Sequence, residues 1–277
     1  MTRTAFITGA STGIGRATAQ RFQAEGWNVA ATMRSPQDGA ALADLPGVLV
    51  TRLDVTDSSS ISAAVAEARA AFGGIDVLVN NAGFGAYGPL EVTDMEVIRR
   101  QFDTNVIGLL EVTQAVLPTL REQHSGVIVN ISSVGGRMAF PLGSLYHGSK
   151  YAVEGLSEAL TYELAPFGVT VKIIEPGRVD TDFGGRSFVL STGPEGSAYQ
   201  GVIGAVFEGF TARQGQDHAS AEDVATVIYD AATDGTRQLR YIVGEDAVAT
   251  LSARAAMDDV AFLDMMRGNF GLTPDAE

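Results

Sequence analysis

The stretch that decides the fold of this chain lies near its N-terminus and reads Thr4-Ala5-Phe6-Ile7-Thr8-Gly9-Ala10-Ser11-Thr12-Gly13-Ile14-Gly15. Its first residues predict a buried strand, and a helical pattern begins near Ile14. Glycine allows the tight turn between them and a close approach of the backbone to a ligand. Because a helix N-terminus offers free N–H groups and the positive end of its dipole, we predict a pyrophosphate site at this turn.

The rest of the chain alternates short apolar runs with longer helical patterns, which is typical of a parallel sheet covered on both faces. The sequence predicts strands at residues 4–8, 28–33, 48–53, 75–80, 126–131, 169–175 and 240–243. It predicts helices at residues 14–25, 58–72, 95–120 (with an interruption), 145–165 and 221–232. No linker or repeat divides the 277 residues. We therefore predict an α/β fold of the Rossmann type, a doubly wound parallel sheet with three layers in a single domain.

The composition excludes several classes of function. Acidic residues (33) outnumber lysines and arginines (19), so the net charge is −14, which opposes binding to nucleic acid or to an anionic membrane. The chain has no cysteine, so disulfides, thiolate catalysis and cysteine-bound metals are excluded. The three histidines are scattered, and we predict no metal site. No signal peptide and no apolar run of membrane-spanning length is present, so we expect a cytoplasmic protein.

The end of the second predicted strand, Thr32-Met33-Arg34, bears on the choice of nucleotide. An acidic residue at this place would bind the adenosine 2′-hydroxyl of NAD. No Asp or Glu occurs between Gly26 and Gln37, whereas an arginine suits a 2′-phosphate by its charge and fork geometry. We therefore predict NADP(H) rather than NAD(H), with a solvated surface role for Arg34 as the alternative.

A tyrosine and a lysine lie four residues apart in Tyr146-His147-Gly148-Ser149-Lys150, and Ser133 precedes the tyrosine by thirteen positions. Residues four apart share one face of a helix. A cation beside a phenol favours the phenolate and lowers the phenol pKa from its usual value of about 10. A serine hydroxyl directed at the same point can hold a substrate oxygen while the phenol transfers the proton. This set predicts chemistry at a carbonyl or carbinol carbon.

These motifs resemble the short-chain dehydrogenase/reductase family in its standard branch, and the match extends from Thr4 to about Thr181. Besides the glycine turn, the family pattern is matched by Asp54-Val55, Asn80-Asn81-Ala82-Gly83, Asn105, Ser133, Tyr146, Lys150, and Pro176-Gly177 followed by Thr181. The late segment Arg240-Tyr241-Ile242-Val243-Gly244 is similar to that of hydroxysteroid-dehydrogenase-like bacterial members.

The resemblance implies an NADP(H)-dependent oxidoreductase with a catalytic set of Asn105, Ser133, Tyr146 and Lys150. Tyr146 would be the acid for reduction and the base for oxidation, and Ser133 would hold the substrate oxygen. Lys150 would lower the pKa of Tyr146 and hold the nicotinamide ribose, and Asn105 would order a proton-relaying water. The implied cofactor contacts come from Gly9, Ser11, Thr12, Gly13, Ile14, Gly15, Arg34, Asp54, Val55, Asn81, Ala82, Gly83, Tyr146, Lys150, Pro176, Gly177, Val179 and Thr181.

Some assignments have structural alternatives. Ser132 could replace Ser133 as the active serine, although the step of thirteen residues to Tyr146 favours Ser133. Asn105 could simply cap or bend a helix. His147 faces away from Tyr146 on a helix, so we interpret it as structural or as a pocket-edge residue.

Residues 182–217 depart from the alternation of strands and helices. They contain eight glycines, one proline and scattered aromatics, without a strong strand run, and they follow the sixth predicted strand, where ligands of open α/β sheets bind. We predict a mobile substrate lid, with a packed excursion as the alternative. Residues 245–277 are predicted to form a helical extension whose apolar residues pack on the body or on a partner subunit, namely Leu251, Ala255, Val260, Leu263 and Met266.

The sequence thus predicts hydride transfer between NADP(H) and a small-to-medium ketone, aldehyde or secondary alcohol. Family habit implies a homodimer or homotetramer formed through the helices near residues 105–120 and 146–165. A catalytically silent NADPH-binding regulatory protein is the first alternative, and the complete catalytic set disfavours it. A sugar-nucleotide epimerase or dehydratase of the extended branch is the second, and the chain length and glycine pattern disfavour it.

Overall fold

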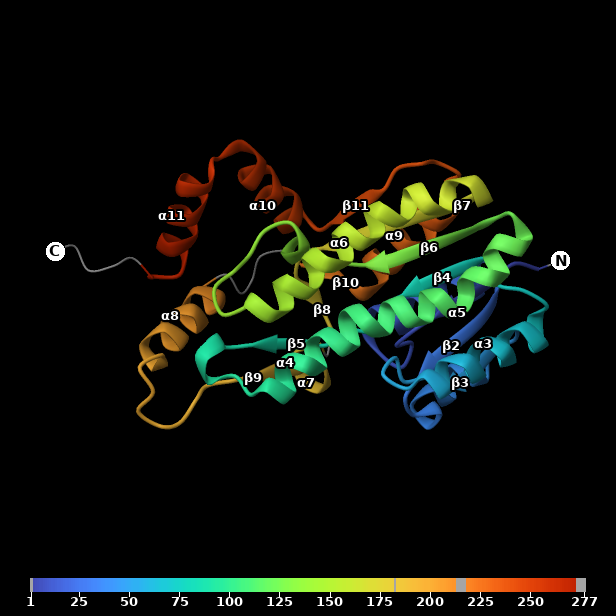
Figure 1. Ribbon diagram of the computed structural model, residues 1–277, viewed down its shortest axis with the longest axis horizontal. Helices are drawn as coiled ribbons and strands as arrows, with labels where there is room; N and C mark the ends of the chain where they lie inside the picture. The colour runs from blue at the N-terminus through green and yellow to red at the C-terminus, as the bar shows by residue number, and fades with distance from the viewer. Residues whose placement is uncertain (1, 182, 213–217, 273–277) are drawn as a thin grey trace.

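The computed structural model describes residues 2–181, 183–212 and 218–272 (Figure 1). The parts of the predicted lid at residues 182 and 213–217, and the part of the predicted extension at 273–277, lie outside the described residues.

A parallel sheet of seven strands forms the centre of the described structure, in the order β11-β7-β6-β4-β1-β2-β3. All seven strands were predicted from the sequence. Chain order reverses at β1, which pairs with β2 on one side and with β4 on the other, and ligands of such sheets bind beyond the strand ends at this point. The strands are β1 (Thr4–Ile7), β2 (Asn28–Met33), β3 (Val48–Arg52), β4 (Val77–Asn80), β6 (Gly126–Ile131), β7 (Val169–Pro176) and β11 (Arg240–Val243).

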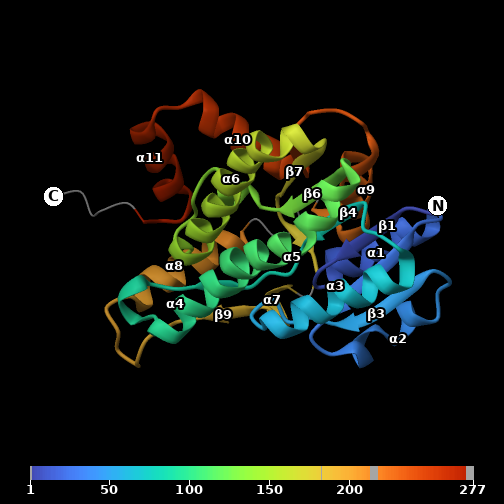
Figure 2. The ribbon, with the colours of Figure 1, turned by 45° about the vertical axis from the view of Figure 1, so that its right-hand side comes forward.

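Helices cover both faces of the sheet and complete the three predicted layers (Figure 2). One face is covered by α1 (Gly13–Ala24) and α9 (Ala221–Thr233), the other by α3 (Ser58–Phe72), α5 (Gly108–Gln123) and α6 (Ser144–Leu164). The remaining helices of the sheet region are α2 (Ala40–Ala43) and α4 (Met95–Phe102), with short 3₁₀ turns at Pro36–Gly39, Leu90–Val92, Val134–Gly136 and Ala165–Phe167.

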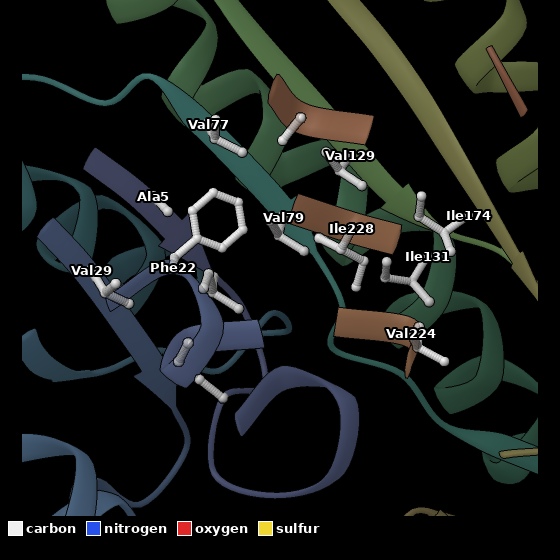
Figure 3. Packing of buried hydrophobic residues seen from close by; sticks show 14 of the residues in the cluster. Ala5, Phe22, Val29, Val77, Val79, Val129, Ile131, Ile174, Val224 and Ile228 are labelled. Atoms are coloured by element: carbon white, nitrogen blue, oxygen red, sulfur yellow. The ribbon is translucent and has the colours of Figure 1, made fainter. Parts of the chain in front are cut away.

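The core under α1 and α9 (Figure 3) and the core under α3, α5 and α6 together explain why β1, β4 and β6 are apolar on both faces. Phe22 of α1 is fully buried against the sheet, near Val79 of β4. Ile228 of α9 packs on the same face and is also fully buried. Packed in this way, the sheet is a rigid support for the loops at its carboxyl ends.

Ser220 begins α9 with a capping box. Its hydroxyl accepts the Asp223 N–H (3.0 Å), and the Asp223 carboxylate accepts the Ser220 N–H (2.9 Å).

Residues 182–217 contain a strand that the sequence analysis missed. Strand β9 (Phe188–Leu190) pairs in parallel with β5 (Gly85–Tyr87), outside the main sheet. The absence of a strong strand run in the sequence is compatible with this strand, because a strand this short has no periodicity of its own and forms only with its distant partner. A second short pair joins β8 (Val179–Asp180) to β10 (Ala219–Ser220), and the lid region also contains α7 (Phe183–Arg186) and α8 (Gln200–Thr211).

The C-terminal extension forms two helices, α10 (Glu245–Ala256) and α11 (Asp259–Asn269), which lie beside α8 (Figure 1). Leu251 and Met266 are buried as predicted, but Ala255, Val260 and Leu263 are exposed. The predicted helical extension is divided into two helices. Asp258 caps the second helix by accepting the Ala261 N–H (2.8 Å), which changes the buried face. Phe262 and Phe270 take the buried positions.

Candidate cofactor and catalytic site

The glycine turn after β1 is too tightly packed for any side chain at two of its positions. Gly9 has φ +67°, and a Cβ there would lie 3.0 Å from the Ala82 Cα. A Cβ on Gly15 would lie 2.3 Å from the Gly9 carbonyl oxygen and 2.4 Å from the Asn81 Nδ2. The turn therefore brings bare backbone to the N-terminus of α1, whose first turn contains no acidic residue. This is the environment that suits a pyrophosphate.

Thr8 and Asn81 hold this turn against the end of β4. The Thr8 hydroxyl oxygen accepts the N–H groups of Asn81 and Ala82, each at 3.0 Å. The Asn81 side-chain amide donates to the carbonyls of Thr8 (2.9 Å) and Gly9 (3.1 Å). Neighbouring Asn80 donates to the Asn130 amide oxygen (2.9 Å) and joins β4 to β6. The predicted asparagine motif thus fixes the turn to the central sheet through four directional contacts around Thr8 and Asn81.

A cavity of about 580 Å³ opens at this end of the sheet, a size typical of ligand sites. All the predicted cofactor-binding residues line it, together with Ser133. Its charged lining residues are Arg34, Arg100, Lys150 and Asp54, so cations predominate although the whole chain is strongly acidic. Shape and charge therefore fit an anionic dinucleotide.

The far rim of the cavity is formed where β2 ends. Met33 is buried and packs toward Gly39, where an added Cβ would lie 2.6 Å from its Cε. Arg34 is exposed and lines the cavity, and within the described part of the chain it has no ion-pair partner. A guanidinium in this position is accessible to a phosphate that enters the cavity.

Tyr146 and Ser133 meet on the catalytic side of the cavity. Tyr146 lies in the first turns of α6 and Ser133 follows β6. Burial raises the pKa of Tyr146, and a hydrogen bond with Ser133 lowers it in part. Our expectation that Lys150 lowers this pKa was wrong for the described structure, because loss of solvent around the phenol outweighs other influences. The phenol therefore keeps its proton at neutral pH.

Lys150 lies one turn further along α6 and is buried. Its Nζ is 5.7 Å from the centre of the Tyr146 ring and donates to the Ile131 carbonyl (2.8 Å). Burial lowers the pKa of Lys150 to about 8, and the nearby Glu154 carboxylate opposes that shift. The amine is thus mostly charged at neutral pH but can lose its proton in mild alkali.

Asn105 lies in a π-helical turn, Asp103–Ile107, between α4 and α5, which is the interruption expected in that helix. Its amide oxygen accepts the Phe84 N–H (2.8 Å), and its Nδ2 donates to the Phe84 carbonyl (2.8 Å) and to the Ser149 hydroxyl (3.1 Å). Asn105 does not line the cavity. Its side chain holds neighbouring backbone, so the predicted water relay, which stays a prediction, would have to use another group such as the Asn105 carbonyl.

Gln101 repeats this arrangement one turn earlier and was missed by sequence reasoning. Its Oε1 accepts the Ala86 N–H (2.6 Å), and its Nε2 donates to the Phe84 carbonyl (2.8 Å) and the Ser149 hydroxyl (3.0 Å). Two amides four residues apart on one helix face are the signal that could have found it. Together with Asn105 it fixes the strand β5 beside Tyr146.

Ser133 and His147, the other two residues with alternative interpretations, are clearly placed. The Ser133 hydroxyl accepts the Gly135 N–H (3.1 Å) and bonds to Tyr146, whereas the Ser132 hydroxyl is buried without a hydrogen-bond partner among the described residues. His147 Nε2 accepts the Phe140 N–H (2.9 Å), and its Nδ1 donates to the Gly135 carbonyl (2.9 Å). Burial lowers the pKa of His147, which keeps the ring neutral. These contacts give His147 a structural position.

An aromatic wall beside Tyr146 was not predicted. The Tyr87 ring stacks on the Tyr146 ring, with centroids 5.3 Å apart, and Phe188 stacks on Tyr87 at 5.3 Å. Phe183 meets Tyr146 edge-on at 6.2 Å. Of the four phenylalanines that could line a pocket or the core, Phe84 is in a core cluster and Phe140 packs against another. Phe183 and Phe188 belong to the wall at the catalytic tyrosine.

Comparison with known proteins identifies this architecture. The model of the short chain dehydrogenase family matches residues 3–188. The chain belongs to the short-chain dehydrogenases. Members of this family are oxidoreductases that bind a nicotinamide cofactor, which agrees with the glycine turn and the cavity described above.

Similar proteins match most of the chain. An uncharacterized oxidoreductase of Schizosaccharomyces pombe is 45% identical over 240 residues, which cover 87% of this chain and all of that protein. Estradiol 17-beta-dehydrogenase 1 of Rattus norvegicus is 40% identical over 202 residues, 69% of this chain and 57% of the rat enzyme. The crystal structure of a short-chain dehydrogenase from Streptomyces avermitilis superposes with a TM-score of 0.81, at 36% identity, and covers 97% of this chain and 98% of that one.

The described residues contain no cluster of three or more histidine and acidic side chains that could bind a metal ion. In the same residues, no helix has both the length and the apolar character needed to cross a bilayer.

Proposed function

We propose that this short-chain dehydrogenase uses NADP(H) to reduce a ketone or aldehyde, or to oxidise the corresponding secondary alcohol, with Tyr146 as the general acid or base. One observation carries the proposal. The hydrogen-bonded pair Tyr146 and Ser133 lines the same cavity as Lys150 and the glycine turn. The nicotinamide supplies or accepts the hydride when it is bound.

The protein's own part is to position the substrate and move one proton. The Ser133 hydroxyl donates a hydrogen bond to the substrate oxygen, and the Tyr146 Oη gives its proton to the same oxygen as charge develops there. Because burial raises the pKa of Tyr146, the resting phenol is protonated, as an acid for carbonyl reduction must be. Reduction is therefore the direction that we propose.

The NADP(H) preference is supported by Arg34, which lines the cavity, is exposed and has no competing carboxylate at the end of β2. Lys150, with its lowered pKa, would hold the ribose hydroxyls of the nicotinamide. Thr181 is positioned to steady the same end of the cofactor, because its side chain lies against the glycine turn, 3.3 Å from where a Gly13 Cβ would be.

The aromatic wall supports an apolar substrate. Tyr87, Phe183 and Phe188 border Tyr146 from the side of the lid region, and rings of this kind bind flat or aliphatic carbon frames. The similarity to a rat estradiol dehydrogenase points the same way. We propose a small-to-medium apolar carbonyl compound, covered by the lid residues that follow β9.

A homodimer or homotetramer is the assembly that we propose. Ile107, Tyr151 and Tyr162 on the α5 and α6 side are exposed by 54%, 47% and 74%, which leaves apolar surface available for a partner copy. Light scattering after gel filtration tests this directly, and a monomer at micromolar concentration would contradict it.

The deciding experiment measures NADPH consumption against a panel of aldehydes, aliphatic ketones and steroid ketones, with NADH in parallel. We expect turnover with NADPH on apolar ketones. Tight NADPH binding with no turnover on any substrate would favour the silent regulatory protein, and faster turnover with NADH would reject the cofactor assignment.

A further inference from the structure

Behind the catalytic helix lies a buried group of charges that the proposed chemistry does not use. Glu175, near the end of β7, has no exposed surface, and Glu154, one turn after Lys150 on α6, is also buried. An isolated buried carboxylate is strongly unfavourable, so such a group must be paired or must hold a proton. The pairing around these two glutamates decides between those outcomes.

The two arginines that contact the pair are shared with a third carboxylate. Arg240 of β11 donates from Nε to Glu154 Oε2 (2.9 Å), and the same Nε lies 3.4 Å from Glu175 Oε1. A second nitrogen of Arg240 bonds to the half-exposed Glu158 (2.7 Å). Arg137 reaches Glu175 Oε2 at 3.4 Å and is itself half exposed. Two guanidinium groups thus face three carboxylates.

Three buried oxygen atoms at this place have no hydrogen-bond partner in the described part of the chain, namely Glu154 Oε1, Glu175 Oε1 and Ser132 Oγ. A Cβ on Gly136 would lie 2.6 Å from the Ser132 hydroxyl and 2.9 Å from the Glu154 Cγ, so Ser132 and Glu154 border the same spot. A proton on one carboxyl would give these atoms a donor, because a protonated carboxyl can donate a hydrogen bond.

The group is adjacent to the catalytic residues. Ser132 lies between Ile131 and Ser133 in the sequence. The carbonyl of Ile131 accepts a hydrogen bond from the Lys150 Nζ. The negative charge of Glu154 opposes the effect of burial on Lys150. The charges that face the pair are Lys150 and Glu158 from α6, Arg137 from the turn after Ser133, and Arg240 from β11.

We propose that Glu154 and Glu175 form a proton-holding pair behind the active site, and that the charge of this pair sets how firmly Lys150 keeps its own proton. The pair acts through Lys150 and does not touch substrate, so both glutamates are positioning residues. The part of the proposal that concerns cofactor binding rests on the proposed function above.

The titration of Glu175 supports this arrangement. Burial and the neighbouring Glu154 raise the pKa of Glu175 to about 7, against the lowering effect of Arg137 and Arg240. Below that pH the pair holds one proton. Above it both carboxylates are ionised, and their added negative charge helps Lys150 to stay protonated.

The first test detects the proton directly and needs no activity. Infrared difference spectra of the purified chain, taken across pH 5 to about 9, report protonated carboxyl groups. We expect a carboxyl band that disappears as the pH rises through about 7. Glu175→Gln should lack this band. Glu158→Gln, which removes an exposed carboxylate from the same Arg240, should keep it.

The second test follows NADPH affinity against pH by fluorescence titration. In the wild type, affinity should fall in alkali as Lys150, with a pKa of about 8, loses its proton. Glu154→Gln removes the negative charge that acts on Lys150, so this fall should move to lower pH by about one unit, which is up to about tenfold in affinity near the midpoint. Glu175→Gln, which removes the other carboxylate of the pair, should shift it in the same direction, and it replaces Glu154→Gln if that variant does not fold. Glu158→Gln should leave the curve in place.

A carboxyl band that persists in both Glu175→Gln and Glu154→Gln would overturn the proposal, and so would an alkaline limb that neither variant moves. A chain with the expected band and the expected shift in NADPH affinity but no carbonyl reduction would support the pair while rejecting the proposed function.

Discussion

The glycine turn from Gly9 to Gly15 is held by directional hydrogen bonds made by the side chains of Thr8 and Asn81. In the region beyond Thr181, α8 and α11 are held by rings. Phe210 meets Phe270 edge-on at 5.0 Å, and both contact Phe140 at 6.2–6.3 Å. Apolar contacts are not directional, and they tolerate changes of size and shape when the total volume is kept.

From this difference we infer that the fold can keep its cofactor site fixed while the ring-packed region beyond Thr181 changes to fit another substrate. The glycine turn must present bare backbone at fixed points, so substitution of its glycines or of Asn81 should disturb cofactor binding directly. The ring-packed region must only exclude water and cover a substrate. We therefore expect substitutions in the two regions to fail in different ways, and each prediction below tests that separation.

The largest effect should come from Tyr146→Phe, which keeps the ring and its stack on Tyr87 but removes the transferable proton. Proton-transfer catalysis is worth about 10² to 10⁴ in rate, and we expect a loss of kcat of at least that order with NADPH affinity kept. Steady-state kinetics and fluorescence titration measure the two quantities. Tyr162→Phe, at an exposed position, is the control and should change neither. Near wild-type turnover in Tyr146→Phe would refute the mechanism.

Phe270→Ala tests whether the two regions are energetically separate. Phe270, at the end of α11, is buried against the rings of Phe210 and Phe140, and truncating a buried phenylalanine costs about 3–5 kcal/mol. We expect faster hydrogen exchange in α8 and α11 and a raised KM for substrate, with unchanged protection of β1 and β4. Phe207→Ala, on α8 and 44% exposed, should have little effect. Equal loosening of β1 would show that the regions are coupled.

Arg34→Ala should change the cofactor preference without changing the fold. Losing a charged hydrogen bond to phosphate costs about 1.5–3 kcal/mol, which is roughly ten- to a hundredfold in affinity. We expect that loss for NADPH and almost none for NADH, measured by parallel titrations. Arg121→Ala, an exposed arginine at the far end of α5, serves as the control. Equal weakening of both nucleotides would mean that Arg34 does not read the 2′-phosphate.

Gly15→Ala should give the smallest change, confined to the glycine turn. Its Cβ would collide with the Gly9 carbonyl and the Asn81 amide, and overpacking of this kind costs about 1–3 kcal/mol. We expect weaker NADPH binding and a lower Tm. Gly155→Ala, on α6 with open space around its Cβ, should raise the Tm slightly because alanine is the better helix former. Identical behaviour of the two variants would contradict the tight packing of the turn.

The same contrast explains how far the sequence could predict the structure. The seven strands and the glycine turn are local patterns, and the structure has them almost residue for residue. Pairing of β5 with β9 depends on residues about a hundred positions apart. The same holds for the ring stack at Tyr87 and for the glutamate pair at Arg240. Such contacts leave no periodicity in the sequence. The pKa direction of Tyr146 failed for a related reason, because burial is a property of the folded chain.

The short pair β5–β9 also limits where the predicted lid could bend. Gly85 N–H donates to the Ser187 carbonyl and Ser191 N–H to the Tyr87 carbonyl, each at 2.8 Å. A movement that included residues up to Ser191 would break the hydrogen bonds between β5 and β9. We therefore expect the hinge of the predicted lid after Ser191, near Gly193, whose φ of +71° is left-handed. We also expect a chimera that exchanges only residues after Ser191 to change which molecules reach the site, while Phe188 stays stacked on Tyr87 and Tyr87 on Tyr146.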